Sequence, residues 1–199
     1  ARMEQQGKLI RTYGGVRPAS GTYLYEEMEQ DSISEKMRIG LYAASLSEPG
    51  ERIYIDSGTT AAEMCRALAR RIAADELPGL TVFTNSLVNL EILAGLCPIH
   101  LTGGEYRPDR RDVCGYQAES SVAGLHFSRC FLGADGFDPA TLFMATDYQT
   151  ARLCELVLTR ADSRYVLADS HKFARPSFVS YCTGTVPGFT VITDACDKE

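Results

Sequence analysis

A run of small polar residues in the first half of the chain could bind an anion. The motif Asp56-Ser57-Gly58-Thr59-Thr60 follows an apolar run at residues 52–55 and precedes a helical pattern. Gly58 would let the backbone turn tightly, and the free N–H groups at the start of the next helix would attract a phosphate. The motif also carries three hydroxyl groups. A capping box between Thr60 and Glu63 with no ligand explains the same residues, and the local pattern leaves both interpretations open.

Carboxylates and a lysine follow two later apolar runs. Asp135 comes shortly after residues 130–132, and Asp169 comes shortly after residues 165–167. Each carboxylate could accept hydrogen bonds from sugar hydroxyls, or could cap the turn that follows it. Lys172 lies three residues beyond Asp169 and could neutralise a phosphate, or could be an ordinary exposed lysine.

Two glycines follow another apolar run, which ends at residue 101. Gly103 and Gly104 remove side chains from this point, so a ligand or another backbone segment could approach closely. A simple tight turn also explains them, and the local pattern alone favours it. The alternation of Arg107, Arg110 and Arg111 with acidic residues just beyond predicts a solvated loop.

Several kinds of chemistry are disfavoured by what the sequence lacks. It contains no Walker A or Gly-x-Gly-x-x-Gly pattern, so a nucleoside triphosphate or dinucleotide is not expected. The seven cysteines form no C-x-x-C pair, and with three histidines they give no zinc spacing. We therefore expect buried, reduced cysteines, no metal and no cofactor. No motif pairs His171 with a base or a nucleophile, so we interpret His171 as a loop residue.

The elements that must position these residues alternate along the chain. Short, continuous apolar runs predict strands buried on both faces, as in a parallel sheet, at residues 52–55, 80–83, 98–101, 130–132, 165–167 and 190–192. Helical patterns occupy residues 61–74, 86–95 and 147–161, and a further helix begins with a capping-box pattern at Ser32 and Glu35. The sequence therefore predicts an α/β fold with a mostly parallel sheet flanked by helices. Its polar strand ends should meet in one crevice.

Composition and charge narrow the function further. The chain has 199 residues, of which 45 % are hydrophobic and 23 % charged, which is typical of a globular domain. The net charge of −6 argues against a surface devoted to nucleic acid. The longest uncharged stretch, residues 176–193, contains prolines and glycines and is not a membrane span. No signal peptide is seen, so we expect a cytoplasmic protein.

The order and spacing of these motifs resemble the effector-sensing domain of DeoR-family transcriptional regulators. The matching segments are RTYGG at 11–15, EK at 35–36, DSGTT at 56–60, TNS at 84–86, GGEY at 103–106, FLGADG at 131–136, ADSHKF at 168–173 and ITD at 192–194. The resemblance implies a Rossmann-like fold similar to ribose-5-phosphate isomerase, glucosamine-6-phosphate deaminase and CoA transferases. It also implies an N-terminal winged helix-turn-helix, a phosphorylated sugar as effector, and a homodimer or homotetramer. Operator DNA would be contacted only through that N-terminal domain, and effector binding would most often relieve repression.

The resemblance also divides the chain. Residues 1–15 would be the end of a DNA-domain helix and the wing, residues 16–31 a linker, and residues 32–199 the effector domain, which we expect to be trimmed of its last helix and strand. Two positions depart from the family pattern: Met28 and Cys154 stand where basic residues are common.

The resemblance implies a particular effector pocket. The phosphate should lie at Ser57, Gly58, Thr59 and Thr60, beside Asp56. Lys36 and Lys172 should supply positive charge, and Asp135 and Asp169 should accept sugar hydroxyls. Asn85, Gly103 and Gly104 should shape the wall.

An enzyme of the same fold, such as a sugar-phosphate isomerase or deaminase, is the alternative. It would need a placed carboxylate base beside a lysine or oxyanion donors, and Asp56, Asp135, Asp169 and Lys172 could supply these parts. The wing-like segment at residues 8–15 favours the regulator, because a free-standing enzyme has no use for it.

Overall fold

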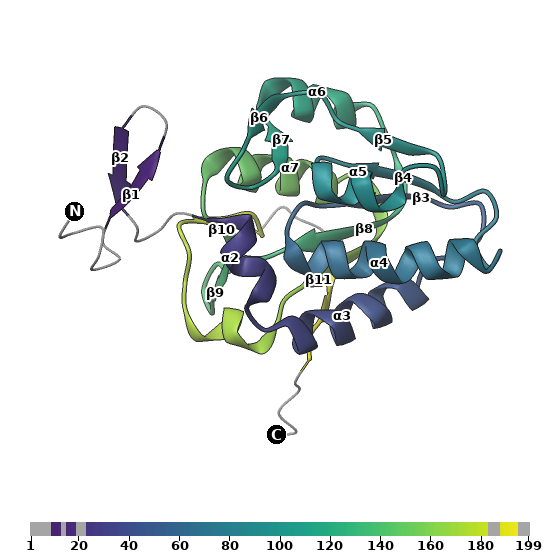
Figure 1. The fold of residues 1–199 in the computed structure, drawn as a ribbon, viewed down its shortest axis with the longest axis horizontal. Coiled ribbons are helices and arrows are strands. Elements are labelled where there is room, and N and C mark those ends of the chain that lie inside the picture. Colours follow the sequence, from purple (N-terminus) through teal and green to yellow (C-terminus); the bar gives the residue numbers. More distant parts are fainter. Residues whose placement is uncertain (1–8, 13–14, 19–22, 183–187, 195–199) are drawn as a thin grey trace.

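The apolar runs form the strands of a central six-stranded sheet. The computed structural model describes residues 9–12, 15–18, 23–182 and 188–194 (Figure 1). All strands of this sheet are parallel, as predicted, in the order β13-β11-β8-β3-β4-β5. The strands are β3 (Arg52–Ile55), β4 (Thr81–Thr84), β5 (Ile99–Leu101), β8 (Phe127–Gly133), β11 (Ala161–Leu167) and β13 (Thr190–Ile192).

The strand order reverses at the centre of this sheet. From β3 the chain proceeds outward through β4 to β5, and it then returns to place β8 on the other side of β3. The carboxyl ends of β3 and β8 therefore flank a topological switch point, where open α/β sheets bind their ligands. The backbone N–H of Asp56 donates to the carbonyl of Phe131 at 2.9 Å, which holds the two strand ends together.

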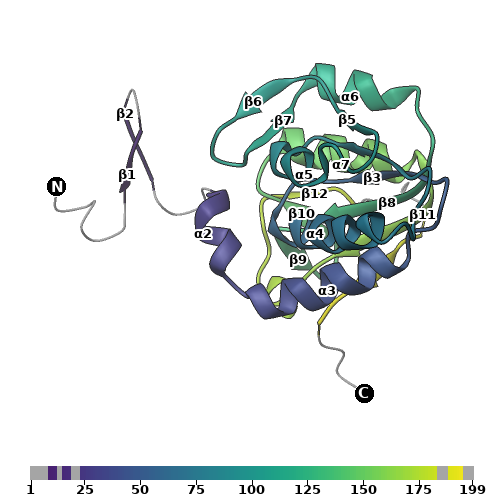
Figure 2. The ribbon, with the colours of Figure 1, turned by 45° about the vertical axis from the view of Figure 1, so that its right-hand side comes forward.

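Helices cover both faces of the sheet, as Figure 2 shows. On one face α3 (Ile33–Ser45) and α4 (Thr59–Ala73) pack on Ile53 and Ile55 of β3. On the other face α6 (Tyr116–Ala123) and α7 (Tyr148–Leu158) pack on side chains that include Tyr54. Consecutive residues of β3 thus enter opposite cores, which explains why the run is continuous rather than alternating.

Several smaller elements accompany the central sheet. An antiparallel sheet has the order β12-β10-β9, a hairpin pairs β6 with β7, and a second hairpin pairs β1 with β2. Two short helices, α2 and α5, and a 3₁₀ turn, η1, complete the described elements. Their bounds are β1 (Leu9–Thr12), β2 (Gly15–Pro18), α2 (Tyr25–Gln30), α5 (Leu87–Leu93), β6 (Glu105–Arg107), β7 (Asp112–Cys114), β9 (Gly136–Asp138), β10 (Leu142–Ala145), η1 (Ser170–Ala174) and β12 (Val179–Ser180).

The structure differs from the sequence-based expectation at some element ends. The capping box at Ser32 is wrong: Ser32 has a left-handed backbone, and its hydroxyl lies 3.0 Å from His171 Nδ1 instead of capping α3. Ala161 begins β11 rather than ending a helix. The segment expected to be a linker contains α2, whose first residue, Tyr25, is buried. The helix end expected at residues 1–6 lies outside the described residues.

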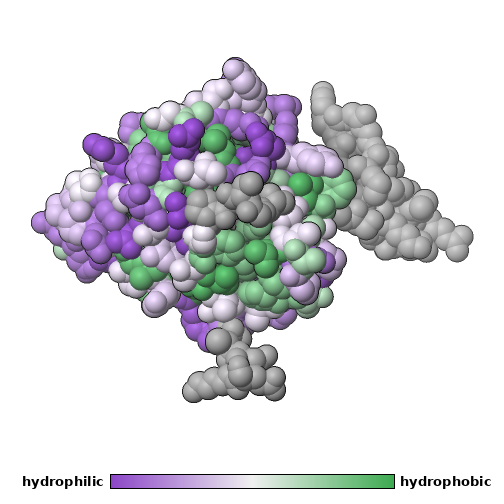
Figure 3. All heavy atoms as spheres, turned by 180° about the vertical axis from the view of Figure 1, so that it is seen from behind, coloured by the Kyte–Doolittle hydropathy of each residue, from purple (hydrophilic) through white to green (hydrophobic). Residues whose placement is uncertain are grey.

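The described part of the chain holds no helix long and apolar enough to cross a membrane. Seen from behind, hydrophilic side chains cover the left of the molecule, and the largest gathering of hydrophobic side chains lies below its centre (Figure 3). The six described cysteines are free, and all but Cys97 are buried. Cys196 lies outside the described residues.

Candidate functional site

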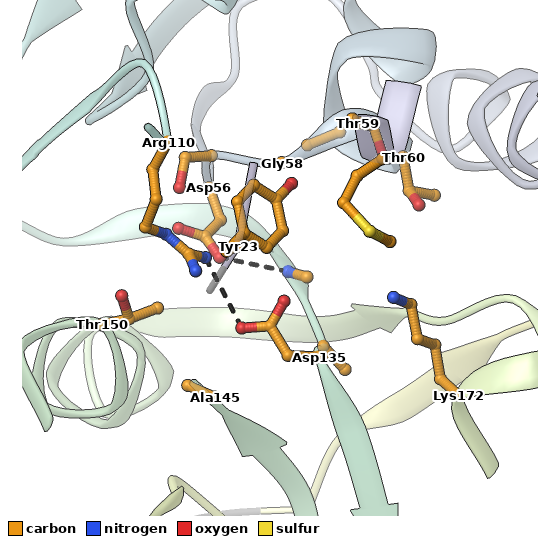
Figure 4. Close-up of a pocket in the computed structure, with 15 residues that line it drawn as sticks. Tyr23, Asp56, Gly58, Thr59, Thr60, Arg110, Asp135, Ala145, Thr150 and Lys172 are labelled. Atoms are coloured by element: carbon orange, nitrogen blue, oxygen red, sulfur yellow. Dashed lines mark hydrogen bonds and ion pairs between the residues drawn. The ribbon is translucent and has the colours of Figure 1, made fainter. Parts of the chain in front are cut away.

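A small cavity lies at the switch point of the central sheet (Figure 4). Residues from the ends of β3 and β8, the start of α4, η1 and the loop before β7 meet there. Its lining consists of Tyr23, Met28, Asp56, Ser57, Gly58, Thr59, Thr60, Ala61, Arg110, Gly133, Ala134, Asp135, Ala145, Thr150 and Lys172. The structure thus brings together seven of the residues expected at the site, namely Asp56, Ser57, Gly58, Thr59, Thr60, Asp135 and Lys172.

The start of α4 forms one wall of this cavity. Gly58 is the residue before the first helical turn, with φ +115°, a conformation that L side chains rarely adopt. Because Thr59 is already helical, Thr60 does not cap the helix, and the ligand-free capping box does not form. Glu63 pairs instead with Arg66 at 2.6 Å. The first-turn N–H groups have no acceptor within the helix, and the helix dipole adds partial positive charge.

Lys172 faces the start of α4 from the opposite wall (Figure 4). It is only 8 % exposed, and among the described residues its ammonium group finds no hydrogen-bond or ion-pair partner. Its backbone N–H donates to the carbonyl of Asp169 at 3.0 Å, while the Asp169 carboxylate caps η1 through the N–H of His171 at 3.2 Å. A nearly buried cation without a counter-ion is costly, so an anion in this cavity would relieve that cost.

Arg110 supplies a second cation to the cavity, which the sequence did not predict. Its Nη2 lies 3.5 Å from Asp135 Oδ2, its Nη1 donates to Thr146 Oγ1 at 2.7 Å, and its guanidinium lies 4.0 Å from the centre of the Tyr23 ring. The prediction of a solvated loop is wrong here, because Arg110 is only 8 % exposed. Its charge is buried against partners that are distant in the sequence.

Arg107 and Asp112 form the support beneath the anion-binding motif. Arg107 donates from Nε and Nη2 to the two oxygens of Asp112, each at 2.8 Å, and from Nη1 to Asp147 at 2.9 Å. Asp112 is fully buried and also accepts a 2.8 Å hydrogen bond from the hydroxyl of Ser57. Asp112, held by Arg107, therefore fixes Ser57 in place, whereas Arg111 pairs with the exposed Glu91 at 2.9 Å as expected of a solvated loop.

Asp56 joins the ends of β3 and β8. Its Oδ2 accepts a hydrogen bond from the N–H of Gly133 at 3.2 Å and lies 3.6 Å from Cys154 Sγ. Burial raises the pKa of Asp56 to about 6, opposed in part by the N–H groups of Gly133 and Ser57. The carboxyl group of Asp56 thus fixes the positions of the strand ends that line the cavity.

The two departures from the family pattern both lie at this site. Met28 lines the cavity, and Cys154 contacts Asp56.

The raised pKa of Asp56 predicts a pH-dependent stability. Between about pH 4 and about pH 6 the folded state holds a proton that the unfolded state has released, so the contribution of Asp56 to stability falls as the pH rises through this window. A shift of about two units corresponds to roughly 2–3 kcal/mol. Asp56→Asn cannot ionise, yet it can accept from Gly133. We therefore expect the wild type to lose about that much stability relative to Asp56→Asn across the window, measured by urea unfolding. A difference that stays constant with pH would contradict the raised pKa.

Lys36 is not among the residues that line the cavity. It is 1 % exposed, and its ammonium group donates to the carbonyls of Met28 and Asp31. Burial, and next the charge of Lys172, lower the pKa of Lys36. The residue fastens the end of α2 to α3, which explains a lysine at a core position.

Asn85, Gly103, Gly104 and Asp169 also lie outside the lining of this cavity. Asn85 is buried and exchanges backbone and side-chain hydrogen bonds with Val113. At Gly104 it is another backbone that approaches: a Cβ would lie about 2.4 Å from the carbonyl oxygen of Cys114. Of the explanations given for the glycine pair, the structure shows close backbone packing at Gly104, whereas a Cβ on Gly103 would make only ordinary contacts.

Gly104→Ala should therefore affect stability rather than ligand binding. The residue has φ +137° and no room for a Cβ, so we expect the free energy of unfolding to fall by roughly 1–3 kcal/mol. Gly124→Ala, where a Cβ would meet nothing within 4 Å, is the matched control and should change it by less than about 0.5 kcal/mol. Equal urea midpoints for the two variants would show that the close approach does not constrain the fold.

The described residues contain no group of three histidine, cysteine or carboxylate side chains that could hold a metal ion. The free volume at the start of α4 is about 30 Å³, whereas two larger cavities of about 480 Å³ and about 580 Å³ share Tyr23 as a lining residue. The free space at the start of α4 is therefore the smallest of the three.

The comparison with protein families decides the class. The family model described as the DeoR C-terminal sensor domain matches residues 31–195. The chain belongs to the DeoR family. The HTH-type transcriptional regulator FruR of Bacillus subtilis is 29 % identical over 97 % of this chain and 76 % of its own length. The lactose phosphotransferase system repressor of Streptococcus mutans is 30 % identical over 90 % of this chain and 71 % of its own length. The first of these DeoR-family relatives is thus named a transcriptional regulator, and the second a repressor of a lactose system.

Solved structures show the same fold at low sequence identity. Ribose 5-phosphate isomerase A from Methanocaldococcus jannaschii has a TM-score of 0.51 and 21 % identity, covering 69 % of this chain and 53 % of that one. The eIF2B delta protein from Chaetomium thermophilum has a TM-score of 0.56 and 17 % identity, covering 84 % and 58 %. This chain therefore spans little more than half of either structure. The likeness confirms the Rossmann-like, isomerase-type fold predicted for this DeoR-family domain.

Proposed function

We propose that this DeoR-family domain binds a phosphorylated sugar, with the phosphate at the start of α4. The observation that carries the proposal is Lys172, a cation that is 8 % exposed, unpaired within the described residues and directed at the first turn of α4. Backbone N–H groups, the Thr59 and Thr60 hydroxyls and the ammonium group would together surround one phosphate.

The sugar would extend from the phosphate toward Asp135. One oxygen of Asp135 accepts the N–H of Thr146 at 3.0 Å and pairs with Arg110, which leaves its second oxygen to accept sugar hydroxyls. Asp169 remains a predicted ligand contact, although its carboxylate caps η1 and lies outside the cavity lining. Arg110 is a further cation that the phosphate or an adjacent hydroxyl would approach.

In the whole protein, this binding would change the affinity of the DNA-binding segment for its operator and most often relieve repression. We propose no catalysis. Asp56 is committed to the N–H of Gly133, and Asp135 is committed in part to Arg110, so neither is placed as a free general base.

A calorimetric panel tests this proposal. Galactose 6-phosphate, fructose 1-phosphate and ribose 5-phosphate are titrated into the chain beside galactose, fructose and ribose. At least one phosphorylated sugar should bind roughly a hundredfold more tightly than its parent sugar, because charge-assisted bonds to the phosphate dominate, and it should be recovered unchanged. Equal affinity for sugar and sugar phosphate would contradict the phosphate site. Steady turnover that is lost in Asp135→Asn would favour the enzyme.

A further inference from the structure

The side chain of Tyr23 occupies the centre of the cavity (Figure 4). Its ring lies on the guanidinium of Arg110, with the carbon of that group 4.0 Å from the ring centre. At its other end, the hydroxyl lies 3.8 Å from the position that a Cβ on Gly58 would take. One side chain thus spans from the second cation of the site to the start of α4.

Little free space is left at the start of α4 while Tyr23 is in place. A volume of about 30 Å³ holds about two water molecules, since each needs roughly 10–15 Å³ on this measure. Tyr23 also lines two neighbouring cavities, which measure about 480 Å³ and about 580 Å³. Withdrawal of its ring would enlarge the space at the start of α4 on the side of these cavities.

The chain after Tyr23 is firmly anchored, so a movement of the ring would be carried to the chain before it. The N–H of Tyr25 donates to the carbonyl of Asp109 at 2.8 Å, and the Tyr25 ring is buried against Ala62 and Val88. Lys36 holds the end of α2 through two carbonyls. In the other direction, only residues 19–22 separate Tyr23 from strand β2 (Gly15–Pro18).

We propose that Tyr23 is an intramolecular plug of the effector site, which the phosphate of the ligand must expel from between Arg110 and α4. This inference rests on the proposed function. The closed and open states have different affinities for a phosphate, so binding shifts the population toward the open state. Expulsion moves the point at which the N-terminal segment joins the sensor domain. The site is thereby coupled to that segment, and the coupling is reciprocal.

A tryptophan at position 23 reports the movement directly, because the chain contains no other tryptophan. In Tyr23→Trp, addition of inorganic phosphate and then of galactose 6-phosphate should shift the emission to longer wavelength and increase quenching by acrylamide. Tyr42→Trp, at an α3 residue that is 58 % exposed, is the matched control and should not respond. Binding that leaves the emission of Tyr23→Trp unchanged would overturn the plug.

The affinity for inorganic phosphate gives a second, independent test, because removal of the plug should increase it. Tyr23→Ala removes the plug and should bind inorganic phosphate roughly ten- to a hundredfold more tightly than the wild type, the factor expected when an open state is populated at about 1–10 %. Tyr23→Phe keeps the ring on Arg110 and should stay near the wild type. Weaker binding by a folded Tyr23→Ala would show that Tyr23 contacts the ligand and is not a plug. If neither protein binds phosphate, the proposed function itself fails.

Discussion

Lys172→Met is expected to weaken the binding of a sugar phosphate by roughly ten- to a hundredfold, or about 1.5–3 kcal/mol. Methionine keeps most of the aliphatic packing of this nearly buried side chain and removes only the charge. The loss follows because the ammonium group has no partner among the described residues and is free to pair with the ligand. Calorimetric titration of both proteins with galactose 6-phosphate measures the difference.

Arg38→Met controls for the general effect of removing one positive charge. The Arg38 side chain is 64 % exposed, and its ion pair with Asp194 is 3.7 Å long, so the variant should bind the ligand with the wild-type affinity. If Lys172→Met and Arg38→Met bind the sugar phosphate with the same affinity, Lys172 has only a structural role. The main support for an anion site is then lost.

The largest loss of stability is expected for Arg107→Met. This change leaves the fully buried carboxylate of Asp112 without its two 2.8 Å hydrogen bonds from the guanidinium. Breaking a buried ion pair by removing one partner typically costs about 3–5 kcal/mol, and at this chain length each kcal/mol lowers Tm by roughly 2–4 °C. Urea and thermal unfolding, monitored by circular dichroism, would measure the change.

The same substitution at an exposed ion pair serves as the comparison. Arg152 pairs with Glu155 at 2.8 Å, but its side chain is 63 % exposed. Arg152→Met should therefore change the stability by less than about 0.5 kcal/mol. If both arginine variants unfold at the same urea concentration, the network beneath the anion-binding motif does not support the fold as described.

The strands and the anion-binding motif could be predicted from sequence because their signals are local. A strand buried on both faces appears as a short continuous apolar run, and each predicted run coincides with a strand of the central sheet. Gly58 followed by two threonines indicates a turn into a helix whatever lies across the cavity. The parallel topology then follows from the alternation of strands and helices.

The burial of the supporting charges could not be predicted because some of their partners are distant in the sequence. Arg110 meets Asp135, 25 positions later, and Arg107 meets Asp147, 40 positions later. From the sequence alone, alternating Arg and Asp residues look the same whether they are solvated or folded inward. The place of Lys36 outside the cavity lining could not be predicted for a related reason: its acceptors are backbone carbonyls, which residue types do not reveal. Tyr23 carried no sequence signal at all.

Amide NMR is the most direct test of the claim that a phosphate binds at the start of α4. The ¹⁵N-labelled chain is titrated with galactose 6-phosphate and with galactose, and backbone shifts are followed residue by residue. If a phosphate binds there, the phosphorylated sugar should shift the amide signals of Gly58, Thr59 and Thr60 most. Lys172→Met should reduce these shifts at equal ligand concentration. Shifts of the same size with galactose, or shifts confined to residues outside the cavity, would contradict that claim.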